Sequence, residues 1–233
     1  MLKSKNLQKA AEDFRYLLNR EYPRKAALEL VGNRYQLTFD QRHLLHRGVF
    51  SDADAESRLK KRITLKEIQG KDFVIDGYNV LITIEAGLSG RPLILGDDGF
   101  TRDISGLSGN FRKTERTEEA LQLTLDVVKR MKPCQTLFLF DAPISMSGNL
   151  AQEVRDLLKK ENLLGDARAV KVPEKILIGF RGVVATSDTA IIDQSKQVAD
   201  LAGYIVNQRL RRLKPAATHL IRWRRKRGPI GKR

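Results

Sequence analysis

The run from Phe73 to Ile82 constrains the fold more than any other part of the chain. Its first three residues are apolar, and Asp76 and Gly77 follow before the chain turns apolar again. A short apolar run that ends in an acid and a glycine is typical of a buried parallel strand that leads into a loop. Ligands bind at the carboxyl ends of such strands in open α/β sheets. A desolvated carboxylate at that place needs compensation, which a metal ion supplies.

Two further apolar runs, in residues 137–142 and 183–188, are also followed by an aspartate, Asp141 in the first and Asp188 in the second. Because the carboxyl ends of parallel strands lie on one edge of a sheet, we expect three carboxylates to converge: Asp76, Asp141 and Asp188. Carboxylates in one pocket repel each other and do not all stay ionised without a cation. Mg²⁺ or Mn²⁺ takes oxygen ligands of this kind. Polar neighbours are expected to support the carboxylates, a water or a phosphate: Asn79, Thr186 and Ser187.

The order of these three strand ends and the residues around them resemble those of the PIN-like superfamily, in particular its NYN branch. The first strand of that branch reads like the Asp-Gly-Tyr-Asn of residues 76–79. The resemblance covers residues 72–206 and looks like that of ribosome-associated endoribonucleases. It implies a three-layer α/β/α domain with a central, mostly parallel sheet. It also implies that the three aspartates are the catalytic residues and the ligands of Mg²⁺ or Mn²⁺, with a metal-activated water attacking RNA.

The segment 173–181 departs from this pattern. Active relatives carry a further acid on a helix that precedes the Thr-Ser-Asp strand, and here the segment holds only Glu174. Other acids are therefore candidate substitutes as metal ligands: Glu118, Glu119, Asp193, Asp98 and Asp103. The alternative is a catalytically weak or inactive RNA- or ribosome-binding protein on the same fold, in which the acids are loop-end capping groups.

Residues 1–69 are expected to form a small, basic, all-helical domain. Helical periodicity runs from Leu7 to Leu18, Pro23 precedes a second helix over 25–35, and Thr38 to Gln41 has the form of a capping box for a third helix. The spacing between residues 26 and 47 suggests a helix-turn-helix-like unit. The region also resembles the N-terminal domain of an uncharacterised prokaryotic family, in which it precedes a PIN-like domain.

Residues 70–206 are expected to form the PIN/NYN-like α/β domain, because strand and helix patterns alternate there. An Asp-Gly pair predicts a β-hairpin insertion at about 91–105. The remaining expected helices are 114–131, 149–161 and 189–201, and the remaining expected strands are 136–140, 167–172, 182–186 and 204–206. Residues 207–233 form the expected basic C-terminal extension.

The net charge of +15 is spread unevenly along the chain. Residues 1–70 carry net +6, residues 71–206 carry net −2 and residues 207–233 carry net +11. Basic flanks around a nearly neutral centre favour a polyanion as partner, and the alternative is a solvated basic surface. RNA is the expected partner and DNA a less favoured one, with a homodimer possible. The expected contacts are Arg34, Arg42, Arg47, Arg222, Trp223, Arg224, Arg225, Lys226 and Arg227.

Several classes of protein are disfavoured by what the sequence lacks. The single cysteine, Cys134, allows neither an internal disulfide nor a cysteine-based zinc site. No apolar run approaches 18 residues and no signal-peptide pattern opens the chain, so we expect a cytoplasmic protein. No glycine-rich dinucleotide fingerprint, phosphate-binding Gly-Lys-Ser/Thr or Gly-x-Ser-x-Gly motif is present.

Overall fold

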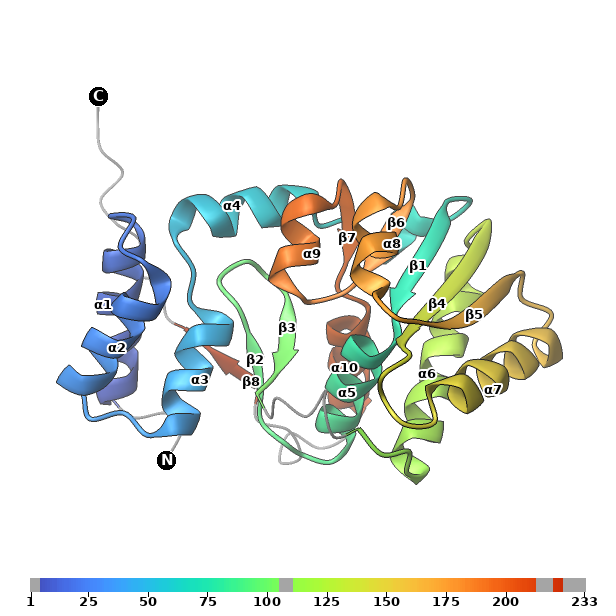
Figure 1. Ribbon diagram of the computed structural model, residues 1–233, viewed down its shortest axis with the longest axis horizontal. Helices are drawn as coiled ribbons and strands as arrows, with labels where there is room; N and C mark the ends of the chain where they lie inside the picture. The colour runs from blue at the N-terminus through green and yellow to red at the C-terminus, as the bar shows by residue number, and fades with distance from the viewer. Residues whose placement is uncertain (1–4, 105–110, 213–219, 224–233) are drawn as a thin grey trace.

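A parallel β-sheet forms the centre of the molecule (Figure 1). The computed structural model describes residues 5–104, 111–212 and 220–223. Within them, a five-stranded sheet has the order β5-β4-β1-β6-β7, and all four pairings are parallel. The strands are β1 (Asp72–Asp76), β4 (Gln135–Asp141), β5 (Gly165–Val170), β6 (Val183–Ala185) and β7 (Gln197–Ala199). The predicted α/β class with a mostly parallel sheet is confirmed.

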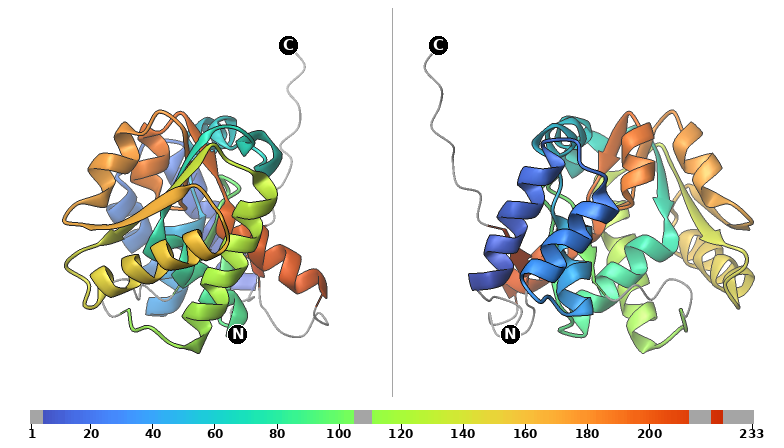
Figure 2. Two further views of the ribbon diagram at one scale, coloured as in Figure 1. Left: turned by 90° about the vertical axis from the view of Figure 1, so that its right-hand side faces the viewer. Right: turned by 60° about the vertical axis from the view of Figure 1, so that its left-hand side comes forward.

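Helices cover both faces of this sheet, which gives three layers (Figures 1 and 2). Successive side chains of a strand point to opposite faces. Phe73 and Ile75 therefore join the core beneath α5 (Gly77–Leu88), α6 (Glu115–Met131), α7 (Ser147–Lys160) and α10 (Leu201–Arg212). Val74 joins the smaller core beneath α8 (Pro173–Gly179) and α9 (Thr189–Gln194).

The strand order reverses direction at β1. From β1 the chain proceeds to β4 and β5 on one side, and then crosses to β6 and β7 on the other. The carboxyl ends of β1 and β6 therefore flank a topological switch point, which is where α/β sheets bind ligands. Ile75 lies opposite Ala185 across this pair of strands, so Asp76 and the residues after β6 emerge side by side.

The N-terminal helices build a second core together with a small sheet. The helices are α1 (Lys5–Leu18), α2 (Arg24–Arg34), α3 (Phe39–Gly48) and α4 (Asp52–Lys61), followed by the 3₁₀ turn η1 (Leu65–Ile68). The hairpin strands β2 (Leu93–Leu95) and β3 (Thr101–Asp103) are antiparallel, and β8 (Leu220–Arg222) pairs with β2 in parallel. Ile94 of β2 and Ile221 of β8 pack into the apolar core of the helices. Figure 1 shows this hairpin between the helical region and the large sheet.

Two local sequence signals are confirmed in detail. The backbone N–H of Gln41 donates to Thr38 Oγ1 at 3.3 Å, and the backbone N–H of Thr38 donates to Gln41 Oε1 at 3.1 Å. These reciprocal bonds are the capping box that begins α3. At the predicted hairpin turn, Gly99 has a φ of 80°, a conformation that glycine adopts without strain.

Three expectations about elements of the large domain are wrong. The predicted helix 189–201 ends at Gln194, and the chain then forms β7. Val198, which is fully buried, pairs with Val184 on one side and accepts a hydrogen bond from Ile63 N on the other, so tertiary pairing outweighs helical pattern there. The predicted strand 204–206 lies inside α10, and the expected loop after Asp76 is the first turn of α5.

The predicted C-terminal extension, residues 207–233, contributes to two described elements. Helix α10 continues to Arg212, and β8 completes the small sheet. Residues 224–233 lie outside the described residues, and they include four of the expected nucleic-acid contacts, Arg224 to Arg227. Among the described residues, no helix has the length and apolar character that a membrane span requires.

Candidate functional site

A pocket of about 400 Å³ lies at the switch point of the large sheet. It brings together residues that are far apart in the sequence, from β1, β4, α8 and the start of α9 on one side and from α2, α3 and β3 on the other. Its acidic residues are Asp76, Asp103, Asp141, Glu174 and Asp188. Its basic residues are Arg24, His46, Arg47 and Arg102. The three aspartates predicted to converge therefore line one pocket.

Asp76 is the most perturbed acid of the pocket. Burial raises the pKa of its carboxyl group to about 7, and the charges of Asp188 and Asp141 add to the rise. A hydrogen bond from Thr186 Oγ1 to Asp76 Oδ2, 2.7 Å long, opposes the rise. Near neutral pH this carboxyl group is divided between its neutral and charged forms, and a nearby cation would favour the charged form.

Asp188 caps the helix that follows it. Its Oδ1 accepts hydrogen bonds from the backbone N–H groups of Ala190 (2.8 Å) and Ile191 (3.2 Å), so the side chain is the N-cap of α9. This is the capping role that the sequence analysis kept as an alternative. The cap and the position in the pocket are compatible, because both bonds use the same carboxylate oxygen.

Asp141, at the end of β4, faces an acid that the sequence analysis discounted. Burial raises the pKa of Asp141, and the charge of Glu174 raises it further. Glu174 lies in the first turn of α8, the short helix that precedes β6, and it lines the same pocket. The segment 173–181 therefore brings its single acid, Glu174, to the site. The signal was the proline before it, which is favoured at the first position of a helix.

The polar neighbours hold the pocket together. Asn79 Oδ1 accepts hydrogen bonds from the backbone N–H of Ser187 (2.8 Å) and from Ser187 Oγ (3.0 Å). Thr186 Oγ1 donates to Asp76 and accepts from the backbone N–H of Asp188 at 3.1 Å. These bonds tie the segment after β6 to the end of β1. Both hydroxyl groups make contacts within the protein, whereas they were expected to hold a water or a phosphate.

The lower-ranked acids take other positions. Glu118 pairs with Lys113 and Glu119 pairs with Arg116 on the surface of α6. Asp98 and Asp193 both pair with Arg58, at 3.4 Å and 2.6 Å. Only Asp103 from this set lines the pocket, where it pairs with Arg47 at 3.3 Å. The neighbouring hairpin acid Asp97 binds Arg15 through both carboxylate oxygens.

The chemistry of the acidic residues suits a hard cation, because every donor among them is a carboxylate oxygen. In the described ranges, however, no group of three or more His, Cys, Asp or Glu side chains is arranged to hold a metal ion. Mg²⁺ commonly binds through one or two carboxylates and keeps several waters. That mode needs only one or two of the carboxylates at Asp76, Asp141 and Asp188.

The predicted nucleic-acid contacts are dispersed. Arg47 lines the pocket, whereas Arg34 lies on the surface beside Asp13, 3.7 Å away, and Arg42 bonds to Leu37 O and Asn33 Oδ1. Arg222 is exposed at the end of β8. Trp223 packs against the core of the N-terminal helices, so its indole ring contributes to folding there. Arg24, His46 and Arg102 line the pocket and were not predicted as contacts.

The fold and the pocket define an α/β protein with an acidic pocket at the switch point of a parallel sheet, faced by basic residues from an N-terminal helical region. The chain belongs to the family described as Domain of unknown function (DUF5616), which matches residues 65–204. A second family, Protein of unknown function (DUF434), matches residues 6–61. The uncharacterized protein MJ0935 of Methanocaldococcus jannaschii is 36% identical over 198 residues, which cover 84% of this chain and 94% of that relative. No solved structure matches the chain.

Proposed function

We propose that this protein is a metal-dependent ribonuclease that cleaves phosphodiester bonds within RNA strands. The observation that supports the proposal is the composition of one pocket. Four carboxylates of the α/β domain, Asp76, Asp141, Glu174 and Asp188, face arginines of the helical region and the hairpin. Metal-dependent cleavage of a phosphodiester needs both a cation site and groups that bind the phosphate.

Each acid has a role that follows from its environment. Asp76 and Asp188 would hold Mg²⁺ or Mn²⁺, and the cation would stabilise charge on the phosphate and lower the pKa of a bound water. Asp141, whose pKa is raised by burial and by the charge of Glu174, is suited to accept a proton on its carboxylate. Glu174 raises that pKa further by its charge, which makes it a positioning residue for this proton transfer.

A binding protein without cleavage activity is the second candidate. The observation that favours it is that the described carboxylates do not form a group of three arranged around a single ion. On this reading the protein binds RNA or the ribosome through the same pocket and leaves the strand intact. The two candidates differ in one measurable property, cleavage of bound RNA.

The decisive experiment is incubation of the protein with a mixed RNA pool and Mg²⁺ or Mn²⁺. We expect cleavage by the wild type, and no cleavage when a chelator is present. Glu174→Gln should lower the rate by about a hundredfold, as expected when proton transfer is impaired. Glu161→Gln is the matched control, because Glu161 pairs with Lys129 outside the pocket. An intact pool after incubation with wild type and either metal, together with tight binding, would establish the binding protein instead.

The C-terminal residues give a separate prediction about affinity. Deleting residues 224–233 removes six basic residues, and we expect weaker RNA binding with a flatter dependence of log K on log salt. The deletion begins after Trp223, because Trp223 and β8 belong to the folded core. Binding titrations over a range of salt concentrations measure the slope. A slope equal to that of the full chain would rule out phosphate contacts by these residues.

A further inference from the structure

The basic side of the pocket contains two guanidinium groups whose hydrogen-bonding capacity is only partly used. We infer that Arg24 and Arg47 bind a backbone phosphate of single-stranded RNA, next to the phosphate that lies at the acidic residues. The N-terminal helices would then hold the substrate directly. This inference rests on the proposed function, because it takes RNA as the substrate and assigns one of its backbone phosphates to the helices.

Arg24 is a partly buried cation whose hydrogen bonds go to neutral carbonyl oxygens. Its guanidinium group donates to the carbonyl oxygens of His46 and Val49 and lies 4.8 Å from the centre of the Phe50 ring. No carboxylate in the described part of the chain forms an ion pair with it. Burial and the positive charges of Arg58 and Arg102 lower the pKa of Arg24 to about 10, and the negative charges of Asp54 and Asp98 offset only part of this effect. An anion in the pocket would relieve this cost.

Arg47 has a donor without a partner. Its Nη2 contacts Asp103 at 3.3 Å, while its Nε is buried and forms no hydrogen bond to any described residue. Burial lowers the pKa of Arg47, and the charges of Asp103 and Asp188 act in the opposite direction. Arg47 and Asp188 line the same pocket, so its basic and acidic sides can act on one ligand.

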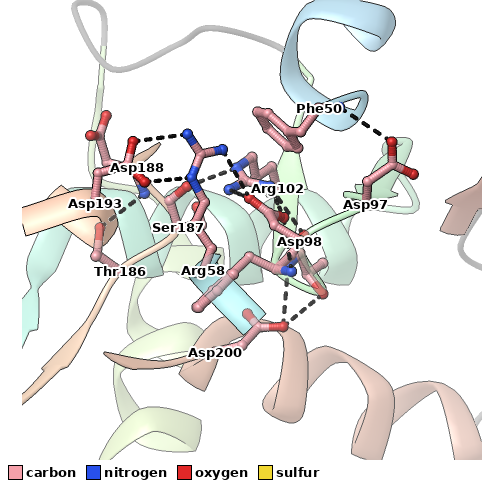
Figure 3. Close-up of polar contacts among 12 residues, drawn as sticks. Phe50, Arg58, Asp97, Asp98, Arg102, Thr186, Ser187, Asp188, Asp193 and Asp200 are labelled. Atoms are coloured by element: carbon pink, nitrogen blue, oxygen red, sulfur yellow. Dashed lines mark hydrogen bonds and ion pairs between the residues drawn. The ribbon is translucent and has the colours of Figure 1, made fainter. Parts of the chain in front are cut away.

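Arg102 differs from these two arginines, because it is fully engaged (Figure 3). Its Nε donates to Ser187 O at 2.7 Å, and its Nη1 and Nη2 donate to the two oxygens of Asp98 at 2.8 Å and 2.7 Å. Arg102 therefore fixes the hairpin to the segment before Asp188. Of the three arginines in the pocket, Arg24 and Arg47 are the two with capacity for a ligand.

A phosphate on a strand fits this arrangement better than a free phosphate ion. Guanidinium groups match phosphate oxygens in geometry and charge. A free phosphate in the pocket would be repelled by Asp76, Asp141 and Asp188 on the opposite side. In a nucleic-acid strand, one phosphate can lie at the arginines while the next lies at the acids, where a cation offsets the repulsion. A single strand suits the pocket because it can bend between the two sides.

Binding of a fluorescent single-stranded hexauridylate, measured without divalent cations over a series of salt concentrations, tests the inference. We expect Arg24→Met and Arg47→Met each to weaken binding about tenfold and to reduce the salt slope by about one. Lys25→Met is the matched control: Lys25 is exposed on the same helix, and the charge change is the same. Its affinity should stay near that of the wild type.

Affinities of Arg24→Met and Arg47→Met equal to that of Lys25→Met would overturn the inference. If either variant melts below the wild type, Arg24→Lys and Arg47→Lys replace them. The lysine variants keep the positive charge and lose the planar guanidinium group. Equal binding by the wild type and both lysine variants would also overturn the inference. Cleavage is scored separately. Arginine-dependent binding without cleavage by the wild type would refute the nuclease and support the phosphate site. Equal cleavage efficiency in the wild type and all arginine variants would support the nuclease and refute the phosphate site.

Discussion

Asp76→Asn is expected to lower the rate of RNA cleavage by about a thousandfold, the largest effect of any single substitution in the pocket. Asparagine has nearly the same shape and can still accept the hydrogen bond from Thr186 Oγ1, so the local structure should persist. The substitution removes the charge that would hold a cation at the end of β1. It also removes a negative charge from a pocket that already contains other carboxylates, so RNA affinity should be unchanged or higher.

Cleavage rates at saturating RNA with Mn²⁺, and dissociation constants in the presence of a chelator, separate these two effects. Asp72→Asn is a closely matched control. Asp72 begins the same strand, is exposed and lies at the opposite edge of the sheet, so its substitution should leave both quantities unchanged. An Asp76→Asn variant that cleaves normally and binds poorly would contradict the assignment of Asp76 to the cation site.

The features that could be predicted from the sequence are those determined by neighbouring residues. The apolar run before Asp76 predicted a buried strand, because a short apolar run that ends at a turn signal is typical of a strand in the interior of a sheet. The Thr38 capping box and the turn at Gly99 are contacts within three residues of each other in sequence. The convergence of Asp76, Asp141 and Asp188 followed from one rule of topology, that parallel strands end at one edge.

The features that sequence did not predict depend on distant partners. Strand β7 has only three residues, and its position is determined by pairing with β6 and by the bond from Ile63 N to Val198 O. The basic side of the pocket includes Arg24 and Arg47, which come from helices that no local pattern connects to the sheet, so the sequence predicted neither of them to face the acids. Glu174 was not among the candidate ligands, although α8, a helix of seven residues, brings it to the pocket.

The acids of the hairpin show how a residue type can suggest a wrong role. Asp98 was a candidate metal ligand, since it lies in a turn near other acids. In the structure it is 0% exposed and contacts the guanidinium groups of Arg102 and Arg58, so its charge is already compensated (Figure 3). Pattern reveals that an acid is present, whereas only the fold reveals which cation faces it.

Asp98→Ala is accordingly expected to cost about 3–5 kcal/mol of the free energy of unfolding. The substitution leaves the buried guanidinium of Arg102 without a carboxylate, and Arg58 keeps only Asp193. It also removes the acceptor of the bond from the backbone N–H of Phe100, 3.3 Å long. For a chain of this size, the loss corresponds to a melting temperature lower by about 10 °C. Thermal unfolding followed by circular dichroism measures it.

Asp166→Ala is the control for this prediction. Asp166 pairs with Arg168 at 2.7 Å, but both side chains are exposed, so the loss should stay below about 1 kcal/mol. Asp98→Ala should also lower cleavage, because Arg102 connects the hairpin to Ser187 O, one residue before Asp188. A fully stable Asp98→Ala variant would mean that the ion pairs around Asp98 are not required for the fold.

The double variant Asp98→Ala/Arg102→Ala shows whether the cost comes from a stranded charge. If it does, removing Arg102 as well should restore part of the stability, and the double variant should lose less than the sum of the two single losses. Strict additivity would mean that Asp98 and Arg102 stabilise the hairpin independently. Because Arg102 also bonds to Ser187 O, stability should recover in the double variant while cleavage stays low. Such a separation would show that the same side chain supports the fold through Asp98 and the pocket through Ser187.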